Sequence, residues 1–113
     1  MHTPFAPTPI VIDALAFQDA SGVWIAQCIQ YDIVAQAKSL PALPKALEQE
    51  IFANLCVNAK LGREGLDGIP PAPQRYQEEF KEATLGLSPN YKFKSLSSTK
   101  QVHLHDLKVA EMA

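Results

Sequence analysis

The stretch GVWIAQCIQYDIVAQAKS, residues 22–39, decides the fold that the sequence predicts. Apolar side chains dominate both alternating positions of residues 23–29. A polar break at residues 30–32 then separates this segment from a second apolar one at residues 33–38. Because side chains alternate between the two faces of a strand, we expect two neighbouring strands of an antiparallel sheet.

The residues before this stretch predict one more strand. TPIVIDALAF, residues 8–17, is rich in β-branched and apolar residues. DASG, residues 19–22, contains residue types that favour a tight turn, so the two segments predict a β-hairpin. With the third strand at residues 33–38, the sequence predicts a three-stranded antiparallel meander.

Helical spacing begins after Ser39, a favourable N-cap residue. Pro41 and Pro44 fall in or near the first turn, where proline is tolerated. We expect this helix to cover the sheet and to end at Gly62 and Gly65. Its apolar residues recur every three or four positions and share one stripe: Leu40, Leu43, Leu47, Ile51, Leu55 and Ala59.

A second, shorter helix is predicted after the proline-rich loop GLDGIPPAP, residues 65–73. Tyr76, Phe80 and Ala83 share one face of this helix, and Gly86 is its expected stop. The predicted class is therefore α+β, with the order β-β-β-α followed by a short helix and a tail.

The tail contains two short alternating segments, YKFKSL and QVHLHDL, and each could be a strand or an ordered tail. We divide the chain into an α+β domain, residues 1–87, and a basic C-terminal extension, residues 88–113. The extension has four lysines against two acidic residues, whereas residues 1–87 have six basic against ten acidic residues. An alternative function follows, in which the chain is a nucleic-acid-binding regulator that contacts phosphates through Lys92, Lys94, Lys100 and Lys108.

Composition limits the class of protein further. The 113 residues suit one domain, and the net charge of −2 gives no general attraction to nucleic acid. Cys28 and Cys56 lack the close spacing of a metal or redox motif, so we expect buried, reduced thiols. The chain has no signal-peptide pattern and no apolar run near the ~18 residues of a membrane span. We therefore expect a cytoplasmic protein.

Both faces of the predicted sheet are apolar, although one helix can cover only one of them. Cover for the second face could come from the second helix, the tail or another chain. We favour another chain, in a homodimer or tetramer. One face of the second strand carries Trp24, Ala26 and Cys28, and the other carries Val23, Ile25 and Ile29.

The residues that could carry chemistry lack partners of the right type in the sequence. Asp13, Asp19 and Asp32 could form a carboxylate set for a metal ion, but Asp19 lies in a turn and no acidic cluster surrounds Asp32. His103 and His105 share a face if QVHLHDL is extended, yet zinc sites need three or four protein ligands. The sequence therefore predicts no catalytic residue, no metal site and no cofactor.

A family resemblance accompanies these patterns. The run GVWIAQCIQYDIVAQAKSLPALPKALEQEI, residues 22–51, resembles the N-terminal domain of HicB-like antitoxins. Members of that family have a second strand that begins with tryptophan, a short turn, a third strand that ends in a small residue, and an immediate helix. Residues 25–28 and 31–33 match best, and the likeness covers about residues 9–61.

The resemblance implies a β-β-β-α core related to a partial ribonuclease H fold without its carboxylate centre. It also implies oligomerisation and, in the family, binding to a small toxin ribonuclease. Ala37 departs from the glycine that members often have, and Pro41 and Pro44 replace an acidic helix start. The C-terminal DNA-binding module found in many members is not expected here.

These observations favour a non-enzymatic protein-interaction module that binds and neutralises a small protein partner. Trp24 and Tyr31 are the predicted anchors of that contact, with Asp32 as a charge at its rim. The competing interpretation places Trp24 in the core against Leu47 and Ile51.

Overall fold

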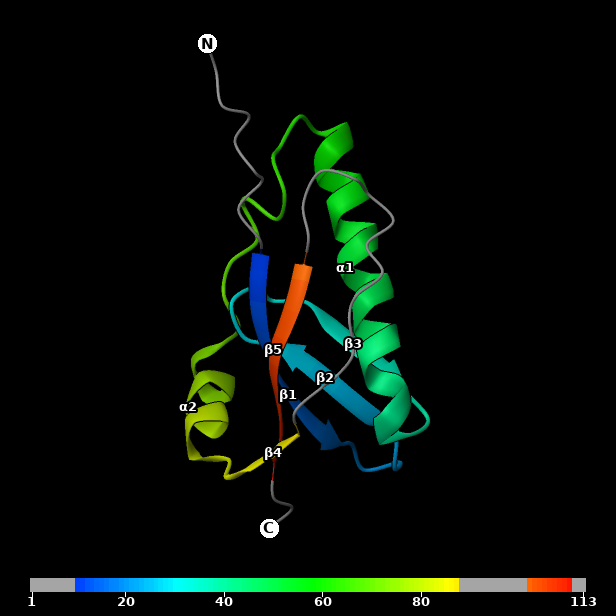
Figure 1. The fold of residues 1–113 in the computed structure, drawn as a ribbon, viewed down its shortest axis with the longest axis vertical. Coiled ribbons are helices and arrows are strands. Elements are labelled where there is room, and N and C mark those ends of the chain that lie inside the picture. The colour runs from blue at the N-terminus through cyan, green and yellow to red at the C-terminus, as the bar shows by residue number, and fades with distance from the viewer. Residues whose placement is uncertain (1–9, 88–101, 111–113) are drawn as a thin grey trace.

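The computed structural model describes residues 10–87 and 102–110 (Figure 1). The described residues form two helices and five strands, with one turn of 3-10 helix before the first helix. In chain order the elements are β1 (Ile10–Gln18), β2 (Trp24–Cys28), β3 (Val34–Ala37), η1 (Leu40–Ala42), α1 (Leu43–Lys60), α2 (Gln74–Glu82), β4 (Leu85–Leu87) and β5 (Val102–Val109).

The strands form a single mixed sheet in the order β3-β2-β1-β5-β4. The first three strands are the antiparallel meander that the sequence predicts, and β4 also pairs antiparallel with β5. Strand β5 runs parallel to β1, with Ile10 opposite Val102. The α+β class and the three-stranded meander are thus confirmed, but the sheet of the described residues has five strands, because β5 and the unpredicted β4 extend it beyond β1. Local periodicity cannot reveal a pairing between segments so distant in sequence.

Residues 102–109 therefore form a strand of the same sheet as β1. The sequence analysis had grouped them instead with the extension 88–113. QVHLHDL is largely a strand, as one of its two interpretations predicted. The other alternating segment, YKFKSL, lies outside the described residues.

The turn between β1 and β2 forms as predicted around Asp19. The Oδ1 atom of Asp19 accepts hydrogen bonds from the Ser21 hydroxyl at 2.7 Å and from the backbone N–H of Ser21 and Val23 at 2.9 and 3.0 Å. Gly22 completes the turn with φ of 89°, a conformation that glycine adopts without steric cost. These bonds, the Ser21 hydroxyl first, lower the pKa of the Asp19 carboxyl below its ordinary value.

Helix α1 buries most of the predicted stripe. Leu43, Leu47 and Ile51 are buried, and Pro44 lies in its first turn. The last stripe position is wrong, because Ala59 is exposed and Asn58 is buried in its place. The Nδ2 atom of Asn58 donates to the carbonyl oxygens of Gly65 and Asp67, both at 3.0 Å, and so fixes the loop after the helix. Asn58 can be buried because these bonds satisfy its amide group.

Helix α2 ends earlier than the sequence predicts. Ala83 takes an extended conformation, with φ of −67° and ψ of 126°, and closes the helix. Gly86, the expected stop, lies in β4 instead. No helix in the described part of the chain has the length and apolar character needed to cross a membrane.

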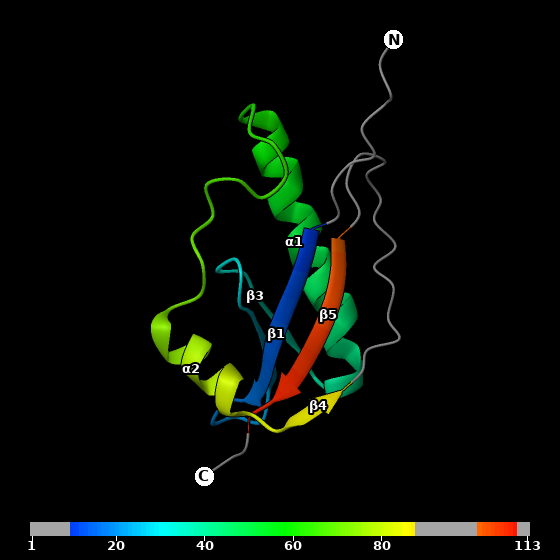
Figure 2. The ribbon, with the colours of Figure 1, turned by 60° about the vertical axis from the view of Figure 1, so that its left-hand side comes forward.

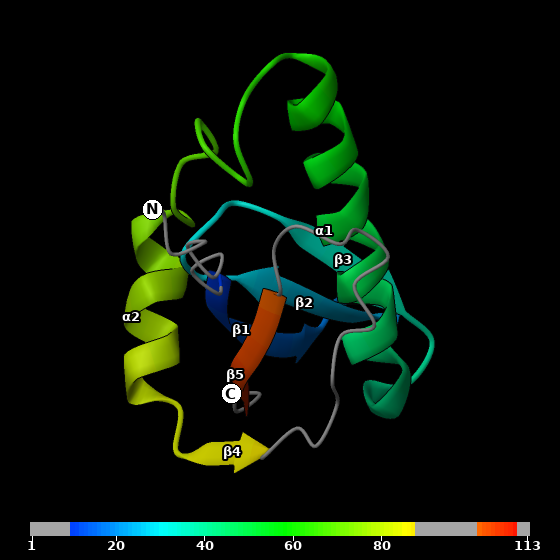
Figure 3. The ribbon, with the colours of Figure 1, turned by 45° about the horizontal axis from the view of Figure 1, so that its top comes forward.

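The two helices lie on opposite sides of the sheet (Figures 2 and 3). The core fills the space between the sheet and α1, and strand β5 contributes Val102, Leu104 and Leu107 to it. On the other side, Tyr76 of α2 stacks on Phe17 of β1 with ring centroids 5.9 Å apart.

The second face of the sheet is thus covered partly from within the chain. Leu15, on that face, is fully buried without any second molecule. The sequence analysis favoured another chain for this cover, whereas α2 supplies it over β1. Val11 and Val34 each keep 47% of their surface exposed, so the cover does not extend to the whole face.

Candidate functional site

The three predicted contact residues lie near the two ends of β3, which forms one edge of the sheet. Trp24 lies opposite Ala37 at one end of β3, and it is half-buried against the core. Tyr31 and Asp32 lie in the turn between β2 and β3, just before the first residue of β3. Tyr31 is also half-buried against the core, whereas Asp32 is exposed. The residues therefore frame one edge strand, and Trp24 combines core contact with partial exposure.

Asp32 is held by two hydrogen bonds that fix the turn. Its Oδ1 atom accepts a hydrogen bond from Nε2 of the buried Gln27 at 3.0 Å. Its backbone N–H donates to the carbonyl oxygen of Pro70 at 2.6 Å. The proline-rich loop thus positions the turn that leads into β3.

Strand β3 has one strand neighbour in the described part of the chain, β2. The N–H of Cys28 donates to the carbonyl oxygen of Ile33 at 2.9 Å, which places these two residues at a hydrogen-bonded pair position of the ladder, although the N–H of Ile33 donates instead to the Tyr31 carbonyl oxygen at 2.7 Å. Such pairs alternate along an antiparallel ladder, so Ala35 also faces β2. The backbone N–H and C=O groups of Val34 and Gln36 therefore point away from the sheet. Their side chains are also exposed, which leaves an accessible edge.

Of the four lysines in the alternative hypothesis, the described residues include Lys108 alone. Its Nζ atom donates to the carbonyl oxygen of Phe80 at 3.1 Å and lies 4.4 Å from the centroid of the Phe80 ring. Lys108 thus ties β5 to α2 rather than standing free for a phosphate. Lys92, Lys94 and Lys100 lie outside the described residues.

The two cysteines differ in their surroundings. Cys28 is buried in the core, and desolvation raises the pKa of its thiol to about 11. Cys56 is half-buried on α1. A thiol with so high a pKa is a poor nucleophile at neutral pH, because the thiolate is the reactive form.

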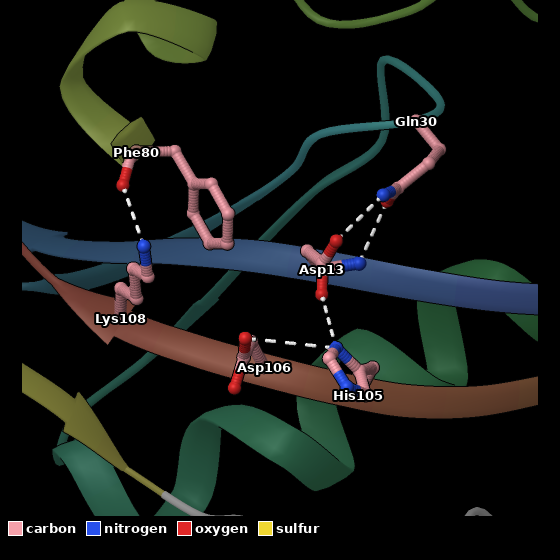
Figure 4. A network of polar contacts seen from close by, with 6 residues as sticks. All are labelled: Asp13, Gln30, Phe80, His105, Asp106 and Lys108. Carbon is pink, nitrogen blue, oxygen red and sulfur yellow. Dashed lines mark hydrogen bonds and ion pairs between the residues drawn. The ribbon is translucent and has the colours of Figure 1, made fainter. Parts of the chain in front are cut away.

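A polar cluster that the sequence did not reveal lies on the α2 side of the sheet (Figure 4). Its three members are Asp13 of β1 and the adjacent His105 and Asp106 of β5. A register shift between Ile12 and Asp13 creates it: Ile12 lies opposite Leu104, but Asp13 lies opposite Asp106. Such a bulge turns His105 and Asp106 to the same face of the sheet.

The distances within this cluster are short. The Nδ1 atom of His105 lies 3.2 Å from Oδ1 of Asp13 and 3.5 Å from Oδ2 of Asp106. The side chains of Asp13, Asp106 and His105 are 20, 43 and 62% exposed. The cluster therefore opens to solvent from the His105 side.

Gln30, from the turn after β2, fixes the orientation of the Asp13 carboxylate. Its Nε2 donates to Oδ2 of Asp13 at 2.7 Å, and its Oε1 accepts the backbone N–H of Asp13 at 2.7 Å. The carbonyl oxygen of Ile29, the ladder neighbour of Asp13, instead accepts hydrogen bonds from Ala72 and Gln77. Gln30 thus replaces a ladder bond and leaves Oδ1 of Asp13 directed at His105.

The sequence carried a signal for this cluster that the analysis missed. Buried or half-buried apolar residues of β5 occupy positions 102, 104, 107 and 109, so the alternation skips one residue between 104 and 107. That skip is what a bulge requires. Of the predicted metal candidates, His105 and Asp13 come together, whereas Asp19, Asp32 and His103 are not part of the cluster.

Searches of protein-family models, of curated proteins and of solved structures found no match to the chain.

Proposed function

We propose that the chain is a non-enzymatic protein-interaction module of the HicB antitoxin type, which binds a small toxin ribonuclease through the edge strand β3. The open edge carries this proposal. Its outward backbone groups can pair with an extended segment of another chain, which is a common way for a sheet to bind a peptide. A cytoplasmic location belongs to the same proposal.

The residues around β3 suit a protein partner. Trp24 and Tyr31 flank the strand and are each half-buried, so both have surface left for contact. Val34 adds an exposed apolar side chain on β3 itself, on the opposite face of the sheet from Trp24. Aromatic side chains at the ends of a pairing strand supply contact area at a small entropic cost, and Asp32 supplies a charge at the rim.

Charge gives the partner its expected character. Residues 1–87 hold ten acidic against six basic residues, so this part of the chain attracts a basic protein. The high pKa of the Cys28 thiol also supports a binding role over nucleophilic chemistry at that residue.

The test begins with the reading frames beside the gene: any that encodes a small basic protein is expressed, and the purified chain is titrated with its product by calorimetry. Val34→Pro removes one outward N–H and places a proline ring on the edge, where proline is tolerated because that N–H is not in the ladder. We expect V34P to stay folded and to bind at least tenfold more weakly, since a lost hydrogen bond of about 1.4 kcal/mol already gives that factor.

Val34→Thr is the matched control. It keeps both the backbone N–H and the β-branched shape, so its affinity should equal that of the wild type. If V34P binds as tightly as V34T, the edge is not the contact. If the neighbouring protein does not bind the wild type at all, the toxin-binding proposal is wrong.

The same edge could pair with β3 of a second copy, which would give the homodimer or a tetramer built from it. Light scattering over a range of concentrations tests this part of the proposal. A mass of 12.4 kDa for the wild type at every concentration would contradict self-association. V34P should remain monomeric where the wild type associates.

A further inference from the structure

We propose that Asp13, His105 and Asp106 form a binding site for one divalent transition-metal ion of the Zn²⁺ type. One imidazole nitrogen and two carboxylate oxygens are ligand types that zinc accepts. The three ligand atoms lie within 4.8 Å of one another. The proposal concerns a face of the molecule separate from the β3 edge and does not depend on the proposed function.

The spacing of the ligand atoms suits a tetrahedral ion. Bonds of about 2.0–2.1 Å from zinc to nitrogen and oxygen place neighbouring ligand atoms roughly 3.3–3.4 Å apart. Nδ1 of His105 lies 3.2 Å from Asp13 Oδ1 and 3.5 Å from Asp106 Oδ2, which brackets that value for the two pairs that include the imidazole, and all three ligand atoms lie within 4.8 Å of one another. An ion can therefore be accommodated between these atoms by small side-chain rotations.

The charges of the cluster favour a cation. Asp13 and Asp106 lie directly opposite each other on adjacent strands, an arrangement in which two like charges destabilise a sheet. Lys108, two residues along β5, is turned to Phe80 and does not balance them. A divalent ion would replace the repulsion between the carboxylates with two attractive contacts.

The surroundings supply the orientation that metal ligands need. Gln30 holds the Asp13 carboxylate by a 2.7 Å hydrogen bond to Oδ2, which leaves Oδ1 for the ion. His105 binds through Nδ1 in its neutral form, with its remaining proton on Nε2. Its 62% exposure leaves an entry path and room for water in the remaining coordination position.

The experiment is a calorimetric titration of the untagged full-length chain with ZnSO₄, repeated with Co²⁺ to record the visible absorption of a tetrahedral site. We expect one equivalent of Zn²⁺ to bind the wild type. His105→Ala and Asp106→Asn should each weaken binding more than tenfold. Gln30→Ala should weaken it roughly 10-fold or more, as loss of a supporting hydrogen bond does in known metal sites.

His103→Ala is the matched control, since His103 is an exposed histidine on the same strand but outside the cluster. It should bind Zn²⁺ as the wild type does. The proposal is overturned if the wild type takes up no zinc, or if H103A loses as much affinity as H105A, which would indicate adventitious histidine binding only.

Thermal unfolding of Asp106→Asn gives a second, independent readout. Without metal, D106N should unfold at a higher temperature than the wild type, because it removes the repulsion with Asp13. With saturating ZnSO₄ the order should reverse, since only the wild type gains stability from the ion. The metal site is refuted if D106N is less stable than the wild type without metal and if zinc leaves that difference in melting temperature unchanged. Asp106 would then belong to a structural ion pair.

Discussion

Truncation of Leu104 to alanine should destabilise the whole protein, because β5 is a central strand of the sheet. Leu104 is 1% exposed, lies opposite Ile12 and belongs to the core beneath α1. The substitution removes three carbon atoms, which corresponds to about 2.4 kcal/mol of transfer free energy at about 0.8 kcal/mol for each carbon. The cavity left behind raises the expected loss to about 3–5 kcal/mol. A domain of this size has about 5–15 kcal/mol in total, so the loss is a large fraction of it.

Urea denaturation followed by tryptophan fluorescence and by circular dichroism measures this loss. With a slope of about 1–3 kcal/mol per molar urea, the midpoint of L104A should fall by about 1–3 M. His103→Ala changes the adjacent, exposed residue and should alter stability by less than about 0.5 kcal/mol. If L104A and H103A had the same midpoint, residues 102–109 would be a separate extension and the five-stranded sheet would be wrong.

Two further predictions concern polar residues. Asn58→Ala leaves the carbonyl oxygens of Gly65 and Asp67 without their donor and should cost about 1–3 kcal/mol in urea denaturation. Asn54→Ala should cost far less, because the Nδ2 atom of Asn54 donates to the Glu50 carbonyl oxygen within the same helix; equal losses would contradict the role of Asn58. Asp19 stabilises the fold through a carboxyl pKa that folding lowers from 3.8, so its contribution is complete above that pH and is lost as pH falls below it. The difference in melting temperature between wild type and Asp19→Asn should therefore shrink as pH falls through this range, and a constant difference would refute the argument.

The local part of the fold follows from the sequence because local physics determines it. Asp19 and Gly22 specify their turn through hydrogen bonds and backbone conformation within five residues. The stripe Leu43, Leu47 and Ile51 identifies the buried face of α1 by its spacing alone. Each of these predictions needs no knowledge of distant segments.

The rest of the fold depends on pairings between distant segments. β5 joins the sheet beside β1 in parallel, and no turn near either strand encodes that register. Asn58 is buried because its amide donates to carbonyl groups of the following loop. A stripe chosen by apolar side chains alone therefore ended wrongly at Ala59. The contact between Tyr76 of α2 and Phe17 covers part of the face for which the sequence favoured a second chain.

The polar cluster shows how one skipped residue changes a site. With strict alternation, His103 and His105 share one face of the sheet and Asp106 lies on the other face. The bulge moves Asp106 beside His105 and aligns it with Asp13, which sequence analysis had considered only with Asp19 and Asp32. The side-chain types were visible in the sequence, but their grouping required the register of β1 and β5.

The central claim is that β3 offers a free backbone edge to a protein partner, and amide hydrogen exchange measured by NMR tests it most directly. In the free chain the amides of Val34 and Gln36 should exchange quickly, whereas that of Ala35, which faces β2, should be protected. On addition of a protein partner that binds the chain in the calorimetric titration, Val34 and Gln36 should become protected. Protection of these two amides in the free chain would contradict a free edge at β3, as would a complex in which both continue to exchange quickly.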